Sequence, residues 1–169
     1  SDGSTFDATM EFAEASYEGE PCQQIPFRRQ MLDANLAQAL DALRQKDLVT
    51  ELFNRQHTIA RIESAAATAA SGAIDQSLIV IEPDNFKQVL DGVGLGNVDV
   101  LLGDMAGLLR RHVGEADIAG RIGEHTFAVL LAKRNLDDTR QFADKLRKAF
   151  DERIFEIGKQ SISLTVSVG

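Results

Sequence analysis

Two short, continuous apolar runs constrain the fold of this chain more than any other feature: "SLIVI" at residues 77–81 and "FAVLLA" at residues 127–132. Each has the length of a β-strand and is far shorter than the roughly 18 residues that a membrane helix requires. A strand that is apolar on both faces has to be covered on both faces. The two runs therefore predict the centre of a sheet with helices packed against it.

Amphipathic segments surround these runs. Helices are predicted at residues 47–72, 84–91, 98–113 and 135–153. The first of them is turn-like at its start and is ended by Ser71-Gly72. A loop is predicted at 91–97, a hairpin at 116–132 and a last strand at 161–169. We expect Met105 to be a core residue, and Phe142, Leu146 and Phe150, with Leu136, to form the inner face of the last helix. The predicted class is α/β (α+β): a mainly antiparallel central sheet flanked by helices, as in a ferredoxin-like palm.

The first 47 residues form a separate part of the prediction. Residues 5–15 and 22–28 are predicted to be strands, and residues 17–21 form the turn between them. In the later part of the chain, Pro83 is expected to end the strand at 77–82. Two strands are too few for a stable domain, so the N-terminal hairpin is expected to belong to a domain that begins upstream. Residues 29–47 carry a leucine stripe that suits either a coiled-coil dimer or a helix packed on its own domain.

Charge and composition exclude some classes of function. The net charge of −8 argues against broad binding of nucleic acid, which needs a basic face. Cys22 is the only cysteine, which rules out an internal disulfide framework and suits a reducing cytoplasm. The first residues carry no basic or apolar region of a signal peptide, and membrane insertion is not expected.

Acidic side chains follow the first apolar run. Glu82 and Asp84 come where the buried strand ends, a place suited to a Mg²⁺ site, with Lys87 near enough to meet a phosphate. The alternative for Asp84 is the N-cap of the next helix. The glycines of "GVGLGN" (92–97) lack the spacing of a phosphate loop, and the three histidines show no zinc spacing.

Several segments, in order, resemble one family. "DLVTELFNRQ", "IEPDNFK", "GLGNVD" followed by Leu102, "RIGEHTF" and "LTVSVG" resemble the D-x-L-T-G-L-x-N-R, D-x-D-x-F-K, G-H-x-x-G-D-x-x-L, R-x-G-G-[DE]-E-F and T-x-S-x-G motifs of GGDEF (diguanylate cyclase) domains. The front end, "FDATMEFAEASYEGEPCQQIPFR", resembles the last two strands of a PAS domain.

The resemblance implies a domain plan. Residues 1–28 would be the C-terminal strands of a truncated PAS domain, 29–46 a linker or signalling helix, and 47–169 a degenerate GGDEF domain lacking its C-terminal end. This order is similar to FimX-type PAS–GGDEF–EAL proteins of cyclic-di-GMP signalling, which implies an EAL domain downstream, a link to type IV pili and twitching motility, and a homodimer through the linker helix as one option.

The family's chemistry joins two GTP molecules across a dimer and needs a carboxylate, a backbone carbonyl and the acid of the signature turn around each metal ion. Glu82 and Pro83 would fill the first two places. The signature itself is Gly123, Glu124, His125, Thr126 and Phe127, so that a glycine and both acids are replaced. An imidazole nitrogen removes a charged oxygen ligand, and Glu124 adds negative charge where a triphosphate would lie.

Recognition of guanine is also altered in this register. Leu90 stands where the family has an Asn, whereas Asp99 keeps the second contact. Glu51 and Leu95 replace a motif glycine and a motif histidine. The product-inhibition motif R-x-x-D would have Gly114 in place of Arg, so that only Asp117 survives.

The leading hypothesis is a non-catalytic GGDEF domain that relays signals between PAS and EAL domains. No catalytic residue and no cofactor is expected, with GTP and Mg²⁺ bound weakly at most through Glu82, Pro83, Lys87 and Asp99. The alternatives are a GTP-binding regulatory domain, an active cyclase with an atypical turn, and a ferredoxin-like domain unrelated to nucleotides.

Overall fold

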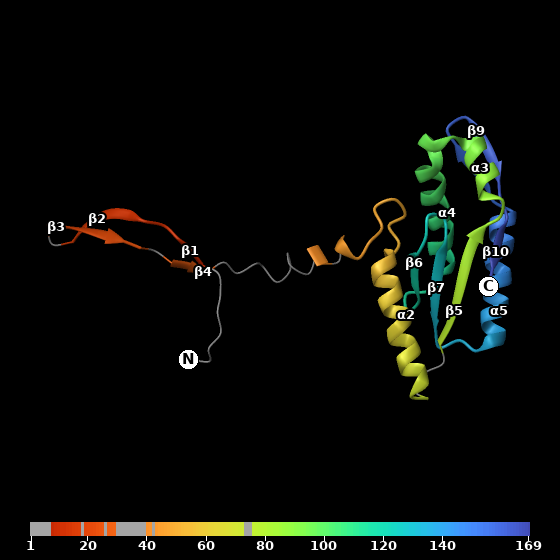
Figure 1. Cartoon of the computed structure of the whole chain (residues 1–169), viewed down its shortest axis with the longest axis horizontal. Helices are drawn as coiled ribbons and strands as arrows, with labels where there is room; N and C mark the ends of the chain where they lie inside the picture. The colour runs from red at the N-terminus through yellow and green to blue at the C-terminus, as the bar shows by residue number, and fades with distance from the viewer. Residues whose placement is uncertain (1–7, 18, 26, 30–39, 42, 73–75) are drawn as a thin grey trace. The chain divides into compact units, whose positions relative to one another are not determined.

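A computed structural model describes residues 8–17, 19–25, 27–29, 40–41, 43–72 and 76–169. The chain divides into two compact units, Ser1–Leu43 and Arg44–Gly169 (Figure 1). The candidate site lies entirely in the second unit, which is described first.

The sheet of the second unit contains β5 (Gln76–Pro83), β6 (Ile118–Arg121), β7 (Phe127–Ala132) and β10 (Val166–Val168). Its strand order is β10-β5-β7-β6, and every neighbouring pair is antiparallel. In chain order this is the fourth, first, third and second strand, the arrangement of a ferredoxin-like βαββαβ fold. The predicted fold class is therefore confirmed.

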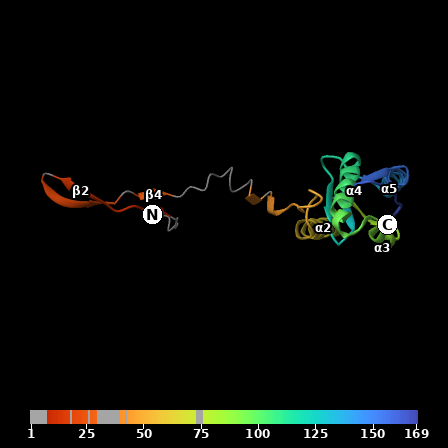
Figure 2. The ribbon, with the colours of Figure 1, turned by 90° about the horizontal axis from the view of Figure 1, so that it is seen from above.

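Helices cover both faces of this sheet. They are α2 (Arg55–Ala70), α3 (Phe86–Val93), α4 (Val98–His112) and α5 (Leu136–Asp151). Figure 2 shows α4 and α5 on one side of the sheet and α2 on the other. Asn54 and Asn135 cap α2 and α5, because each side chain accepts a hydrogen bond from the backbone N–H three residues later.

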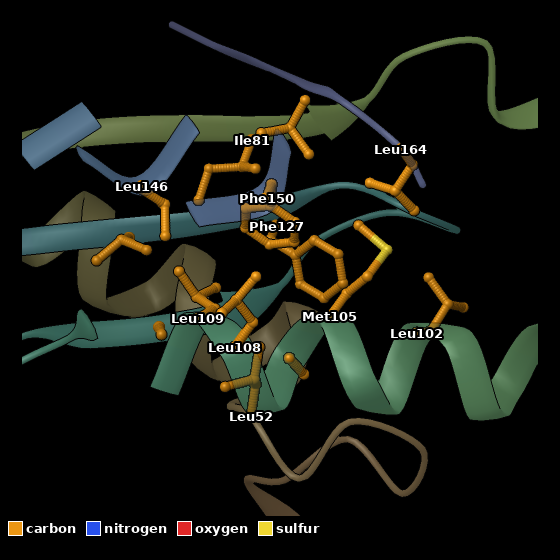
Figure 3. Packing of buried hydrophobic residues seen from close by; sticks show 14 of the residues in the cluster. Leu52, Ile81, Leu102, Met105, Leu108, Leu109, Phe127, Leu146, Phe150 and Leu164 are labelled. Carbon is orange, nitrogen blue, oxygen red and sulfur yellow. The ribbon is translucent and has the colours of Figure 1, made fainter. Parts of the chain in front are cut away.

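The core fills the space between the sheet and the pair α4–α5 (Figure 3). Met105 is fully buried, and Phe142, Leu146 and Phe150 point into the same cluster, as predicted. The prediction for Leu136 is wrong, since it is 62% exposed at the first position of α5.

The predicted single strand at 161–169 is also wrong. Residues 160–163 form β9 (Gln160–Ser163), which pairs with an unpredicted strand, β8 (Ile154–Ile157), through a turn at Gly158. Leu164 is buried at the break, and only β10 joins the main sheet. The alternation of apolar residues continues through the break, so the pattern alone hides the change of partner.

Two boundaries near the first strand also differ from the prediction. β5 continues through Pro83, and the N-cap of α3 is Asn85, with φ 52°, rather than Asp84. The predicted loop at 91–97 is mostly helical, because α3 extends to Val93 and a 3₁₀ turn, η1, covers Leu95–Asn97.

The first unit contains β1 (Ala8–Met10), β2 (Ala13–Tyr17), β3 (Glu20–Gln24) and β4 (Phe27–Arg29). β2 pairs with β3 and β1 with β4, both antiparallel, so the two predicted strands form one interrupted hairpin. Most of the predicted linker helix, residues 30–39 and 42, lies outside the described residues. Its first residue, Arg29, belongs to β4. The described residues near its end that are helical are Leu40, Asp41, Leu43 and Arg44.

Within the described ranges, no single helix has the length and hydropathy to cross a membrane. Within the same ranges, α3 and the segment Leu95–His112 have the required length and hydropathy only when they are taken together, and a bend of 100° separates them.

Candidate functional site

A cleft of about 690 Å³ opens where β5 ends. It lies between α3, the first turn of α4 and the turn that joins β6 to β7. Its lining residues are Glu82, Pro83, Asn85, Phe86, Lys87, Leu90, Leu95, Val98, Asp99, Leu102, Arg121, Glu124 and His125. The tertiary structure thus brings together Glu82, Pro83, Lys87 and Asp99 with two residues of the signature turn.

Glu82 and Asp84 point to different places although they flank the same proline. Glu82 lines the cleft with its side chain 57% exposed. Asp84 is absent from that lining and accepts hydrogen bonds from Ser167 Oγ and Thr165 Oγ1, both at 2.6 Å. These two hydroxyl groups lower the pKa of Asp84 below its ordinary value. Asp84 therefore ties β5 to the β10 end, and Glu82 alone of this pair faces the cleft.

His125 is the central side chain of the signature turn. Its Nε2 lies 3.2 Å from Glu82 Oε1, and its ring stacks on Phe86 with 4.3 Å between centroids. Nδ1 is buried and has no hydrogen-bond partner among the described residues. The imidazole thus occupies the space beside the Glu82 carboxylate and is held there from both sides.

The backbone of the turn is held by arginines. Arg121 donates to the carbonyls of Gly123 (3.2 Å) and Glu124 (2.6 Å), and Arg55 donates to the carbonyl of Ile122. The other end of the Arg121 guanidinium lies 3.4 Å from Asp47 Oδ1. These contacts give Arg121 a structural role in the hairpin between β6 and β7.

Two glycine positions of the turn behave differently. A Cβ at Gly123 would lie 2.9 Å from Thr126 Oγ1 and 3.1 Å from Thr126 Cβ, so a side chain here would have to displace that of Thr126. Glu124, at the position of the motif's second glycine, does not have a positive φ. Outside glycine, the described residues with positive φ are Glu51, Asn85 and Lys133. Glu124 therefore changes the charge of the cleft without straining the backbone.

The far end of the cleft is apolar. Leu90 and Leu102 line it together with Val98, and Leu95 stands at its edge with 83% of its surface exposed. Asp99 lies in the first turn of α4, where a carboxylate interacts favourably with the helix dipole. In the described part of the chain, the side chains of Lys87 and Asp99 form no hydrogen bond or ion pair with protein groups.

Two further predicted positions lie outside the cleft. Asp117 accepts hydrogen bonds from the backbone N–H groups of Ala132 and Gly114 and from Arg134, and its side chain is only 4% exposed. Glu51 adopts φ 57° and pairs with Arg110 at 2.7 Å. Asp117 therefore joins the segment before β6 to the end of β7, whereas Glu51 makes an exposed ion pair from a residue with positive φ.

Sequence reasoning missed the role of Phe86 in the cleft. Its place in the "IEPDNFK" motif was the available signal, but the stacking on His125 depends on how β5 and the β6–β7 turn meet. Asp47 was also missed, although it accepts from the backbone and side chain of Thr50 as well as lying against Arg121.

A ferredoxin-like palm with a cleft at the end of its first strand and a β-turn signature opposite defines the class of nucleotide-cyclase-like domains. The family described as "Diguanylate cyclase, GGDEF domain" matches residues 29–169. The chain therefore belongs to the GGDEF family, whose members take part in cyclic-di-GMP signalling.

Individual relatives agree with this assignment. "Diguanylate cyclase DgcP" of Pseudomonas aeruginosa is 34% identical over 133 residues, 77% of this chain and 20% of that protein. "Response regulator PleD" of Caulobacter vibrioides is 28% identical over 85% of this chain and 31% of that protein. The chain spans less than a third of the length of these two relatives.

Solved structures give the same result. The FimX GGDEF domain from Pseudomonas aeruginosa has a TM-score of 0.71 and 29% identity, covering 74% of this chain and 77% of that chain. Diguanylate cyclase SiaD from the same species, solved with its activator SiaC, has a TM-score of 0.71 and 28% identity, covering 80% of this chain and 52% of that chain.

Proposed function

We propose that this domain is a non-catalytic regulatory module of a cyclic-di-GMP signalling protein. The observation that carries the proposal is the position of His125, with its Nε2 3.2 Å from Glu82 and its ring stacked on Phe86. In the register of the family's signature motif, His125 takes the position of the acid that the family's chemistry needs beside a metal ion.

The donor set around Glu82 does not fit Mg²⁺. This ion prefers six oxygen ligands in octahedral geometry, and here the carboxylate faces an imidazole nitrogen. The proposal therefore assigns no Mg²⁺-dependent catalytic step to this domain.

Two other replacements act in the same direction. Glu124 lines the cleft and places a carboxylate on the side expected for the triphosphate. Leu90 lines the far end and offers no hydrogen bond to a guanine base. Phosphoryl-transfer enzymes depend on positioning and on charge stabilisation, so the three changes together remove most of the catalytic advantage.

The proposed role is relay of a conformational signal within a longer protein. A PAS domain before residue 29, an EAL domain downstream and a linker-helix homodimer belong to this proposal, as does action in type IV pilus or twitching-motility control. The similarity of this chain to the FimX GGDEF domain supports that setting. We place this activity in the cytoplasm, where nucleotide second messengers act.

A cyclase assay tests the proposal. The chain is incubated with GTP and Mg²⁺ or Mn²⁺ at high protein concentration, with an active diguanylate cyclase as positive control. We expect no cyclic-di-GMP. Product formed by the unmodified chain and lost in His125→Ala would establish an active cyclase with an atypical turn instead.

A restoration series tests the physical reason. The imidazole of His125 and the carboxylate of Glu124 are proposed to prevent binding of GTP with Mg²⁺. Replacing both, with Glu124→Gly and His125→Glu, should therefore raise the Mg²⁺-dependent affinity for GTP at least about tenfold. Glu115→Gln, which changes an exposed acid outside the cleft, is the matched control and should leave that affinity unchanged.

A second candidate is a GTP-binding regulatory domain that no longer cyclises. It is favoured by the open cleft, in which Lys87 and Asp99 remain available to a ligand. Calorimetry with GTP and Mg²⁺ separates the two candidates: micromolar binding that Asp99→Ala abolishes selects the GTP-binding domain, and absence of binding selects the relay module.

A further inference from the structure

Residues 44–54, called the entry segment below, are folded back on themselves before α2 begins. Lys46 and Phe53 form an antiparallel bridge, and the Lys46 ammonium lies 3.8 Å from the centre of the Phe53 ring. The backbone N–H of Asn54 donates to the carbonyl of Gln45 at 2.8 Å. The two ends of the entry segment are therefore held together by backbone and side-chain contacts.

The amide of Asn54 makes two different contacts. Its Oδ1 accepts from the backbone N–H of His57 at 2.9 Å and so caps α2, whereas its Nδ2 donates to the carbonyl of Arg44 at 2.6 Å. Asn135 caps α5 in the same way, but in the part of the chain that the structure describes its Nδ2 donates to no group. Asn54 therefore combines a helix cap with a bond to the start of the entry segment.

The entry segment is also joined to the signature turn through Arg121. The backbone N–H of Arg121 donates to the carbonyl of Phe53 at 2.9 Å, and its guanidinium lies 3.4 Å from Asp47 Oδ1. The Arg121 and Asp47 side chains are only 17% and 23% exposed, so solvent screens this pair less than a surface ion pair. The same guanidinium donates to the carbonyls of Gly123 and Glu124.

A second contact runs beside the first. Arg55, the first residue of α2, donates to the carbonyl of Ile122. Arg55 and Arg121 thus hold three successive carbonyls of the turn that presents Glu124 and His125 to the cleft. A continuous series of polar contacts therefore leads from the entry segment to the wall of the cleft.

We propose that the entry segment couples the position of the chain at Arg44 to the signature turn, and that Asn54 is the positioning residue of this coupling. A displacement at Arg44 passes through Asp47 and Arg121 to the turn and changes how often the turn opens. The coupling also acts in the opposite direction, because the free energy that links two sites is the same for both. This inference rests on the proposed relay role, since it names the residues that carry the signal.

Amide hydrogen exchange of the whole chain, followed residue by residue by NMR, measures the opening of the turn. The reporters are Ile122 and Gly123, whose N–H groups donate to the carbonyl of Thr126 at 2.9 and 3.2 Å. Asn54→Asp keeps the cap oxygen and removes the donor to Arg44. We expect both reporters to exchange about three- to tenfold faster, the range of one lost hydrogen bond. Unchanged exchange at both reporters would overturn the proposal.

A matched control and an internal reference exclude general destabilisation. Asn135→Asp makes the same chemical change at the cap of α5 and should leave the two reporters unchanged. In Asn54→Asp, the amides inside α5 should change by less than about twofold, because the cap of α2 is kept. Equal acceleration of α5 and the reporters, or an equal response to both variants, contradicts the coupling.

A double variant tests the route. Arg121→Gln by itself should also accelerate exchange of the turn, since it releases the carbonyls of Gly123 and Glu124. In that background, Asn54→Asp should add less than about a further twofold. The same factor for Asn54→Asp in both backgrounds refutes a route through Arg121. These measurements contain no nucleotide, so their failure is recognised separately from product formation in the cyclase assay.

Discussion

Gly120 is the position where one added methyl group should damage the fold most. It lies in β6, where α2 crosses the sheet. A Cβ there would lie 1.8 Å from Thr58 Oγ1, 2.8 Å from Thr58 Cβ and 2.9 Å from the carbonyl oxygen of Phe53. All three distances are shorter than those that real Cβ atoms adopt, and two of the atoms cannot rotate away.

The expected magnitude follows from these contacts. Overpacking a core by one methyl group costs about 1–3 kcal/mol. Gly120→Ala must also shift the segment around Phe53, whose backbone N–H and carbonyl bond to Ala119 and Arg121. We expect a loss of about 3 kcal/mol in the free energy of unfolding, measured by urea denaturation followed by circular dichroism.

A control and a rescue make this result interpretable. Gly107→Ala adds a methyl group in α4 with nothing within 4 Å and should stabilise the protein by up to about 1 kcal/mol through helix propensity. Thr58→Ala removes the nearest obstacle, so the double variant with Gly120→Ala should lose less than the two single changes added together. A loss below about 0.5 kcal/mol for Gly120→Ala would refute the packing argument.

Two further predictions concern the segment that enters the domain. Burial alone would raise the pKa of Asp47, but the hydrogen bonds from Thr50 and the Arg121 guanidinium outweigh it and hold the pKa below its ordinary value. The ionised carboxylate of Asp47 therefore stabilises the fold above the unfolded pKa of about 3.9, and this stability is lost as the pH falls through the folded pKa. In Asp47→Asn, the free energy of unfolding should depend less on pH in the acid range, as measured by urea denaturation at a series of pH values. Glu51→Gly should be more stable than Glu51→Ala by about 1 kcal/mol, since both lose the Arg110 pair and only glycine relieves φ 57°; equal thermal denaturation of the two variants would contradict this.

The local signals of the sequence were sufficient for most elements of the second unit. Residues 98–113 and 135–153 carry apolar side chains at helical spacing, and they form α4 and α5 in the structure. The continuous apolar run 127–132 is β7, which lies between β5 and β6 and is buried along nearly its whole length. These features depend on neighbouring residues, which is why periodicity predicts them.

Prediction failed where the partner of a segment is distant in the chain. Residues 161–169 alternate regularly, yet one half pairs with β8 and the other with β5. Asp84 suited an N-cap by its position, but Thr165 and Ser167 bind it instead. No local pattern distinguishes these outcomes, because either partner satisfies the same backbone and side-chain groups.

The sequence by itself determined the family of this domain and the βαββαβ order of the elements that build its main sheet. Only the tertiary structure decided that His125 lies against both Glu82 and Phe86, and that Glu82, Asp99 and Glu124 line the same cleft. The physical reason is that charge and shape in a cleft are sums over residues from several elements, and their distances are set by how the helices pack on the sheet.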